Sequence, residues 1–192
     1  MILSSKSIPS MVIEEPTVIR QPLNSSEWQK IKETLAFHFK NVDSFSRRML
    51  TSSAIAIEEQ LKKLDELMDL LCIHTCPSCA DICCHAKNVF YNEVDLFFLT
   101  IHGSFYPPHQ TRSSPEQKLC SYWEPHRGCT IPRLFRPYIC TWFICDNQVK
   151  IMENMLTIRE HREVISSYTI IRHHRLILAS FLPPLEIASK NI

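Results

Sequence analysis

Glycine is scarce in this chain, which has only two glycines, Gly103 and Gly128, among its 192 residues. Phosphate-binding loops and dinucleotide-binding fingerprints need several glycines close together, because the backbone must approach the phosphate groups closely. Neither pattern is present here. The sequence therefore excludes nucleotide chemistry that depends on a glycine-rich loop.

Long apolar runs are also missing. Residues 1–9 lack the apolar core of a signal peptide. The most apolar late stretch, residues 168–182, is interrupted by the four basic residues 172–175, whereas a membrane span needs roughly 20 apolar residues in succession. We therefore predict a soluble, cytoplasmic protein without a membrane partner, and in that compartment thiols stay reduced.

Neither sign of charge is in excess. The formal net charge is +1, so there is no electrostatic reason to expect broad binding to nucleic acid. The short basic clusters Arg47–Arg48 and residues 172–175 are expected to be solvated helix faces. Hydrophobic residues make up 45% and charged residues 21% of the chain, which is typical of a folded globular domain.

Cysteine, in contrast, is abundant. Eight of the nine cysteines fall into two quartets, Cys76-x2-Cys79-x3-Cys83-Cys84 and Cys120-x8-Cys129-x10-Cys140-x4-Cys145. A thiolate is a soft ligand that binds zinc and iron strongly, and an odd number of cysteines argues against a pure disulfide framework. We predict that both quartets bind metal, with the second folding back over the first to complete the coordination.

Other residues near the quartets leave alternatives open. Because neighbouring side chains point apart, the pair Cys83-Cys84 either serves two metals or has one ligand beside a packed or reactive thiol. His74, His85 and His126 are close enough in sequence to replace a thiolate, although a surface or hydrogen-bonded role is the simpler interpretation. We interpret Cys72 as a buried thiol at the end of a helix, because a free cysteine often packs as a small apolar residue.

Apolar residues recur at three- and four-residue steps along much of the chain, which predicts a mainly helical fold. Residues 27–41 form one such pattern, with a capping box expected between Ser26 and Gln29. The clearest pattern spans residues 45–71. Its expected buried stripe consists of Leu50, Ala54, Ile57, Leu61, Leu64, Met68 and Leu71.

Three further helical segments are predicted. One starts at Asn92, a good N-terminal cap, and ends at Gly103. A short helical turn that carries Cys140 is opened by Pro137, since proline is tolerated at a helix start. A long helix is expected over residues 153–181.

Proline marks the parts that are not helical. Residues 1–24 contain three prolines and no helical period, so we predict an extended N-terminal arm. Residues 103–133 contain five prolines and are predicted to be mostly loop. We predict that residues 25–192 form a single helical domain, a bundle with a cysteine-rich, loop-built metal-binding insert over the cysteine-cluster region 72–146.

The motifs of residues 72–146 follow one another in a specific order: Cys76-x2-Cys79-x3-Cys83-Cys84, Cys120, Gly128-Cys129-Thr130-Ile131 and Arg136-Pro137-Tyr138-Ile139-Cys140. This order resembles the YkgJ-like cysteine-cluster family, which is described as a zinc- or iron-chelating domain. The resemblance implies as ligands Cys76, Cys79, Cys83, Cys84, Cys129 and Cys140, with Cys120 and Cys145 next. It also implies that Arg136 holds the loop, by bonding backbone carbonyls or by neutralising the negative charge of a thiolate cluster.

Three functions fit these expectations. The first is a metal-binding protein in which zinc or iron is structural or regulatory, with the helices offering a surface to a protein partner. The second is an iron–sulfur redox protein or a cluster-dependent oxidoreductase or methyltransferase, because thiolates hold such clusters. Flagellin lysine N-methylases are similar in their cysteine arrangement. The third is storage, delivery or sensing of a soft metal ion.

Overall fold

The structure of the chain is a computed structural model, and it describes residues 19, 22–76, 84, 89–112, 117–124 and 128–185. In chain order its elements are α1 (Ser25–Asn41), α2 (Ser44–Thr75), α3 (Glu93–His102), β1 (Trp123–Glu124), β2 (Gly128–Cys129), the 3-10 helix η2 (Arg133–Phe135), α4 (Ile139–Trp142), α5 (Asp146–Met155) and α6 (Ile158–Ser180). Most of the described residues are helical, so the prediction of a mainly helical fold is confirmed.

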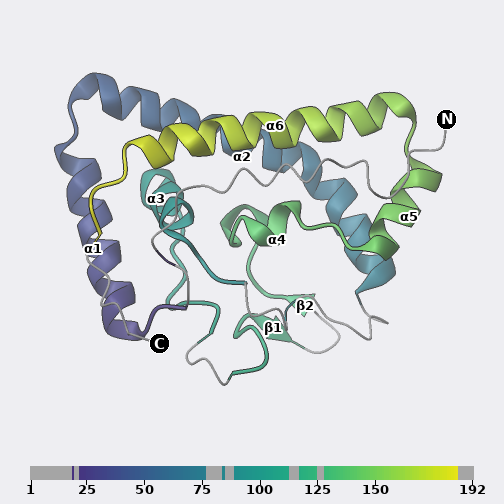
Figure 1. The fold of residues 1–192 in the computed structure, drawn as a ribbon, viewed down its shortest axis with the longest axis horizontal. Coiled ribbons are helices and arrows are strands. Elements are labelled where there is room, and N and C mark those ends of the chain that lie inside the picture. Colours follow the sequence, from purple (N-terminus) through teal and green to yellow (C-terminus); the bar gives the residue numbers. More distant parts are fainter. Residues whose placement is uncertain are drawn as a thin grey trace.

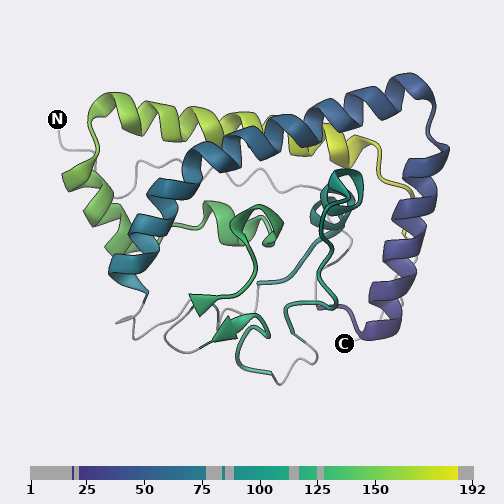
Figure 2. The ribbon, with the colours of Figure 1, turned by 180° about the vertical axis from the view of Figure 1, so that it is seen from behind.

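The helices form an arch over the loop-rich part of the chain (Figure 1). The helices α2 and α6 pack against each other across the top, with α1 at one side and α5 at the other. Beneath them lie α3, α4 and the antiparallel pair β1–β2, and the view from behind shows the same arrangement (Figure 2). Because α2 contacts α3, α5, α6 and η2, it joins the helical layer to the loops.

Helix α1 begins at a capping box formed by Asn24 and Glu27. The Asn24 side chain accepts a hydrogen bond from the Glu27 N–H, and the Glu27 carboxylate accepts one from the Asn24 N–H, each at 3.0 Å. These two bonds satisfy N–H groups that have no partner within the helix. The predicted box of Ser26 and Gln29 is therefore wrong, because both residues lie inside the helix. The helix itself is confirmed.

Helix α2 confirms the predicted apolar stripe. All its predicted members are buried: Leu50, Ala54, Ile57, Leu61, Leu64, Met68 and Leu71. The helix is capped by Asp43 and continues past the predicted end at residue 71 to Thr75. This additional turn places Cys72 on the helix and makes Cys76 its C-terminal cap.

Helix α3 has the start and end that the sequence predicts. The Asn92 side chain accepts a hydrogen bond from the Asp95 N–H at 2.9 Å, and the Asp95 carboxylate accepts one from the Asn92 N–H at 3.0 Å. Gly103 ends the helix at φ 73°, in the left-handed region that glycine adopts without a steric penalty. Residues 93–99 are all buried, so α3 is a core helix.

Residues 153–181 do not form one helix, which corrects the prediction. Helix α5 ends at Met155, and α6 starts after Thr157. The Thr157 hydroxyl accepts a hydrogen bond from the Glu160 N–H at 3.3 Å, and the Glu160 carboxylate accepts one from the Thr157 N–H at 2.7 Å. Thr-x-x-Glu is itself a helix-start signal. The continuous apolar period across this region concealed it.

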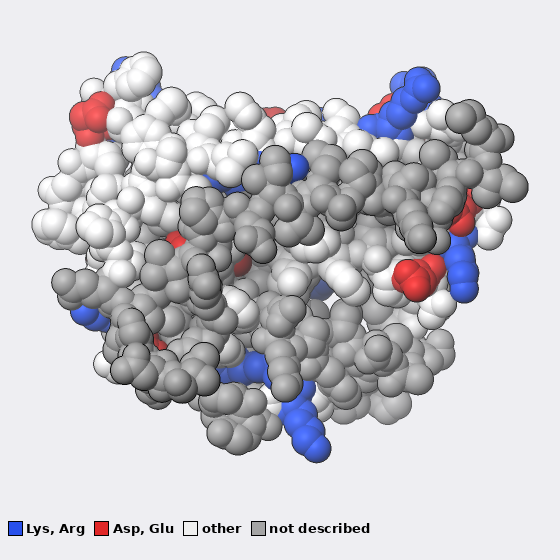
Figure 3. All heavy atoms as spheres, viewed as in Figure 1, with Lys and Arg blue, Asp and Glu red and all other residues white. Residues whose placement is uncertain are grey.

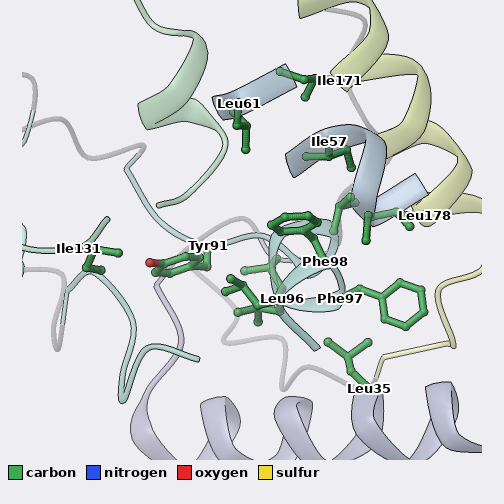
Figure 4. Packing of buried hydrophobic residues seen from close by; sticks show 14 of the residues in the cluster. Leu35, Ile57, Leu61, Tyr91, Leu96, Phe97, Phe98, Ile131, Ile171 and Leu178 are labelled. Carbon is green, nitrogen blue, oxygen red and sulfur yellow. The ribbon is translucent and has the colours of Figure 1, made fainter. Parts of the chain in front are cut away.

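The hydrophobic core lies where α3 packs beneath the other long helices (Figure 4). Side chains from four helices meet there: Leu35, Ile57, Leu61, Leu96, Phe97, Phe98, Ile171 and Leu178. Tyr91 extends this core toward the loops, with its hydroxyl pointing to the side on which Ile131 lies. Its ring is fully buried and packs edge-on against Trp28 at a centroid distance of 5.6 Å. Residues of the loops and of the helices therefore belong to one hydrophobic core.

Arg175 of α6 and Asp95 of α3 form a buried ion pair. Arg175 Nη1 lies 2.7 Å from Asp95 Oδ1, and the two residues are only 3% and 4% exposed. The same oxygen accepts a hydrogen bond from the Tyr138 N–H at 3.2 Å, and the guanidinium lies 4.1 Å from the centre of the Tyr138 ring. The expectation that residues 172–175 form a solvated face is wrong for Arg175, because Asp95 provides a counter-charge inside the core.

Of the predicted N-terminal arm, residues 1–24, the structure describes Ile19 and residues 22–24. Ile19 and Leu23 are buried, and the Ile19 N–H donates to the Glu93 carboxylate at 3.1 Å. This part of the arm is thus packed against α3. The rest of the arm lies outside the described residues, and the single-domain organisation stays a prediction.

The charged side chains give no large patch of one sign on the face seen in Figure 3, where the described acidic and basic residues are scattered. This agrees with the balanced formal charge of the whole chain. Within the described ranges, none of the helices is both long and apolar enough to traverse a membrane.

Replacing Arg175 with methionine is expected to lower the free energy of unfolding by about 3–5 kcal/mol, because Asp95 loses a buried counter-charge. Arg159→Met on the same helix is the control. Arg159 has an 88% exposed side chain, and its ion pair with Glu163 is worth about 0–1 kcal/mol. Urea unfolding followed by circular dichroism measures both variants, and equal midpoints would contradict the stabilising role of the buried pair.

Candidate metal centre

The structure describes seven of the nine cysteines, and no disulfide joins any two of these seven. Cys79 and Cys83 lie outside the described residues, as do His85 and His126. We divide the described cysteines into two sets by the part of the fold that carries them, and these sets differ from the quartets in the sequence. The loop group comprises Cys84, Cys120, Cys129 and Cys140, and the helix-end group comprises Cys72, Cys76 and Cys145.

Main-chain hydrogen bonds hold three members of the loop group together. The Cys120 N–H donates to the Cys84 carbonyl at 3.1 Å, and the Cys120 carbonyl accepts from the Trp123 N–H at 3.1 Å. Trp123 in turn faces Cys129 across the β1–β2 pair. The structure thus brings Cys84 of the first sequence quartet next to Cys120 and Cys129 of the second.

The charge of the loop-group thiols affects the pKa of two tyrosine hydroxyls. Burial raises the pKa of Tyr122 to about 12, and negative charge on Cys120 and Cys129 adds to the rise. Burial also raises the pKa of Tyr91 far above its ordinary value, with further contributions from Tyr122, Cys140, Asp95 and Cys129. Negative charge on Cys129 therefore acts on both tyrosine hydroxyls, and negative charge on Cys140 acts on that of Tyr91.

The helix-end group lies where α2 ends and α5 begins. Cys72 Sγ accepts hydrogen bonds from Arg133 Nη2 at 3.8 Å and from Gln148 Nε2 at 3.7 Å. The side-chain oxygen of Gln148 accepts a hydrogen bond from the main-chain N–H of Cys145 at 3.2 Å. Gln148 therefore joins the start of α5 to the last turn of α2, which carries Cys72 and Cys76.

The surroundings of Cys72 favour its thiolate. A hydrogen bond with Cys76 is the largest cause that lowers the pKa of Cys72, to about 6, while burial opposes the change and Arg133 and Arg136 add to it. Cys72 lies near the end of α2, as predicted, but it is half-buried and polar groups contact its sulfur. The four-residue spacing of Cys72 and Cys76 is visible in the sequence, and α2 places both residues on one helix face.

Arg133 supplies positive charge to the helix-end group from a nearly buried position. Its side chain is 4% exposed, and Nη2 lies 2.6 Å from the Asp69 carboxylate. Its Nε faces the Asp65 carboxylate at 3.5 Å, and burial raises the pKa of Asp65. The two carboxylates fix the direction of the guanidinium, so that it points toward Cys72.

Arg136 contacts the loop group through the main chain. Its Nε donates to the Ile131 carbonyl at 2.8 Å, and the Cys129 thiol donates to the same carbonyl at 3.8 Å. Arg136 is thus placed where it orients the segment that follows Cys129, and its charge also acts on Cys72. Arg136 therefore interacts with both groups: with the loop group through the Ile131 carbonyl and with the helix-end group through its charge.

The donor set suits zinc or iron, because both ions bind thiolates strongly. Among the described residues, no three side chains of His, Cys, Asp or Glu stand together as a ready set of ligands. Two of the predicted ligands, Cys79 and Cys83, lie outside that part of the chain. His74 lies on the exposed face of the last turn of α2.

A shallow groove of about 620 Å³ lies away from the cysteines, at the corner between α1 and α2. It is lined by Val42, Ser44, Arg47, Arg48, Thr51 and Ser52. The Arg47 guanidinium already donates to the carbonyls of Lys40 and Val42. We therefore place the candidate site at the cysteines and not in this groove.

In the metal-free chain, the rate at which Cys72 reacts with iodoacetamide is expected to be half-maximal near pH 6, because only the thiolate attacks. Arg133→Met should move this midpoint to higher pH, since it removes a donor and a positive charge. Arg159→Met, which removes an exposed charge in the first turn of α6, should leave it unchanged. Mass spectrometry of the modified peptide measures the rate. A midpoint near the ordinary thiol value of about 8.5 would contradict the assignment.

Comparisons of this chain with protein-family models, with curated proteins and with solved structures found no match. The fold and the candidate site are thus described from the residues of the chain itself. The resemblance to the YkgJ-like family rests on the cysteine motifs and stays a prediction.

Proposed function

We propose that this chain is a metal-binding protein that coordinates zinc or iron through cysteine thiolates, in a structural or regulatory role. The observation that carries the proposal is the meeting of distant cysteines in the loop group. Main-chain hydrogen bonds join Cys84 to Cys120, and Cys120 to the strand pair that carries Cys129. Cysteines whose main chains are held close together, with no disulfide among the described ones, supply the thiolate donors that both ions accept.

Coordination would supply the stability that the loops lack. Between α3 and α4, the described residues form only the two-residue strands β1 and β2 and the short helix η2. Structural zinc contributes roughly 10–16 kcal/mol in small peptides, whereas the entropy cost of closing a loop grows slowly with its length. We infer that the metal holds this part of the fold in place.

The proposed ligands are the eight cysteines of the two quartets: Cys76, Cys79, Cys83, Cys84, Cys120, Cys129, Cys140 and Cys145. We propose that the chain is related to the YkgJ-like family through these positions. The hydrogen bond from Arg136 to the Ile131 carbonyl supports the proposed role of Arg136 in holding the loop next to the metal.

The nature of the proposed ligands supports a structural or regulatory role. Four thiolates saturate a zinc ion and leave no open position for water or substrate. Because the ligands must stay reduced, we propose a cytoplasmic location. Beyond the metal ions, the outer helix faces offer a surface to a protein partner, and neither nucleic acid nor a membrane is proposed as a partner.

Protein purified without oxygen is expected to be colourless and to contain zinc in a fixed ratio to the chain. Elemental analysis measures the zinc, and the visible absorption spectrum detects iron–sulfur clusters. A brown protein with cluster absorption would favour the alternative function, an iron–sulfur redox protein or cluster-dependent oxidoreductase or methyltransferase. A chain that retains neither metal would refute metal binding altogether.

Cys79→Ser and Cys140→Ser are each expected to lower the bound metal and to loosen the loops, because a hydroxyl is a poor substitute for a thiolate ligand. Ile73→Ser is the matched control, since it introduces the same residue at a 69% exposed position beside the site. Elemental analysis and limited proteolysis measure the two effects. Metal contents indistinguishable from that of Ile73→Ser would show that these cysteines are not ligands.

A further inference from the structure

Cys72 is not among the eight proposed ligands, yet three polar groups contact its sulfur. Arg133 Nη2 lies 3.8 Å and Gln148 Nε2 lies 3.7 Å from Cys72 Sγ, and Cys76 shares a hydrogen bond with the thiol. N–H donors of this kind orient and stabilise the sulfur ligands of metal ions. A thiol that only fills space in an apolar core does not collect such donors.

The spacing of Cys72 and Cys76 suits chelation of one ion. The two residues lie one helical turn apart at the C-terminal end of α2, and therefore on the same face. With Zn–S bonds of about 2.3 Å, two sulfur ligands of a tetrahedral ion are about 3.8 Å apart. Two thiols that already share a hydrogen bond need little movement to reach this separation. Cys76 is exposed, so an ion can approach from solvent.

The charged side chains around Cys72 balance one another before the thiols ionise. Arg133 Nε and Asp65 Oδ1 are buried 3.5 Å apart, and neither atom has a hydrogen-bond partner. The positive charges of Arg133 and Arg136 are matched by the negative charges of Asp65 and Asp69. Two thiolates would add two negative charges to this balanced set, and a divalent cation would neutralise them.

We propose that Cys72 is a metal ligand that forms with Cys76 a two-thiolate site for a thiophilic divalent cation such as Zn²⁺. This inference rests on the metal-binding function proposed above and adds a ninth cysteine to its ligands. Arg133 and Gln148 are positioning residues that hold the sulfur of Cys72. Gln148 also holds the main chain of Cys145, which brings a third cysteine to the same helix junction.

Protection from alkylation tests the proposal in the unaltered full-length chain. The reduced, metal-free protein is treated with iodoacetamide with and without Zn²⁺, and the modification of each cysteine is followed by mass spectrometry. Zn²⁺ is expected to slow the modification of Cys72 by about the same factor as that of Cys76, and a chelator is expected to restore both rates. Equal modification of Cys72 with and without Zn²⁺, while Cys76 is protected, would overturn the proposal.

Co²⁺ provides a second measurement, because each thiolate ligand contributes to the sulfur-to-cobalt charge-transfer absorbance. Cys72→Ser is expected to lose the same share of this absorbance as Cys76→Ser. Ile73→Ser on the same turn is expected to lose none. An absorbance of Cys72→Ser equal to that of the unaltered chain would count against the proposal.

The two measurements separate the failure of this inference from the failure of the proposed function. Protection of other cysteines without Cys72 leaves the metal-binding function in place and removes Cys72 from the ligands. Protection of no cysteine overturns both. If Cys72→Ser loses its helical circular dichroism, its cobalt absorbance is not informative. The alkylation of the unaltered chain then decides whether Cys72 is a ligand.

Discussion

The buried ion pair between Arg175 and Asp95 is the contact that ties the helical core to the segment carrying Cys140. Asp95 closes the capping box of α3 through Asn92, binds Arg175 of α6 and accepts the main-chain N–H of Tyr138. A carboxylate buried this deeply is stable only because several donors surround it. Cys140 lies two residues after Tyr138, so the helical core fixes the position of one proposed ligand before any metal binds.

Much of the helical layer follows from local sequence patterns. The apolar period predicts the buried face of α2, and Asn92 and Gly103 predict both ends of α3, because each signal acts between close neighbours in the chain. Arg175 could not be predicted in this way. Its residue type favours the surface, and its burial depends on Asp95, which is 80 residues away. The break at Thr157 has a local signal, the capping box with Glu160, but the helical pattern of the sequence continues on both sides of it.

For the candidate site, too, the sequence indicates the chemistry of the residues but not their arrangement in space. The density of cysteines indicates metal-binding chemistry, because thiolates are soft ligands, but their order along the chain does not give their grouping. Cys84 meets Cys120 through the main chain, and Cys145 is linked through Gln148 to Cys72, which is 76 residues from Gln148. These contacts depend on how α2 and α5 meet, which is a tertiary property.

The spatial grouping would determine how the proposed metal acts on the fold. The strand pair orders Cys129, and the Tyr138 hydrogen bond orders Cys140, so a bound ion would have fewer residues to immobilise than in a fully flexible loop. A cation at the helix-end group would in addition tie the end of α2 to the start of α5, on the side of the arch away from α1 (Figure 1). The packing of α1, α2, α3 and α6 relies on apolar side chains and the Arg175–Asp95 pair. Loss of metal would therefore release the loops first, while the core formed by these helices persists.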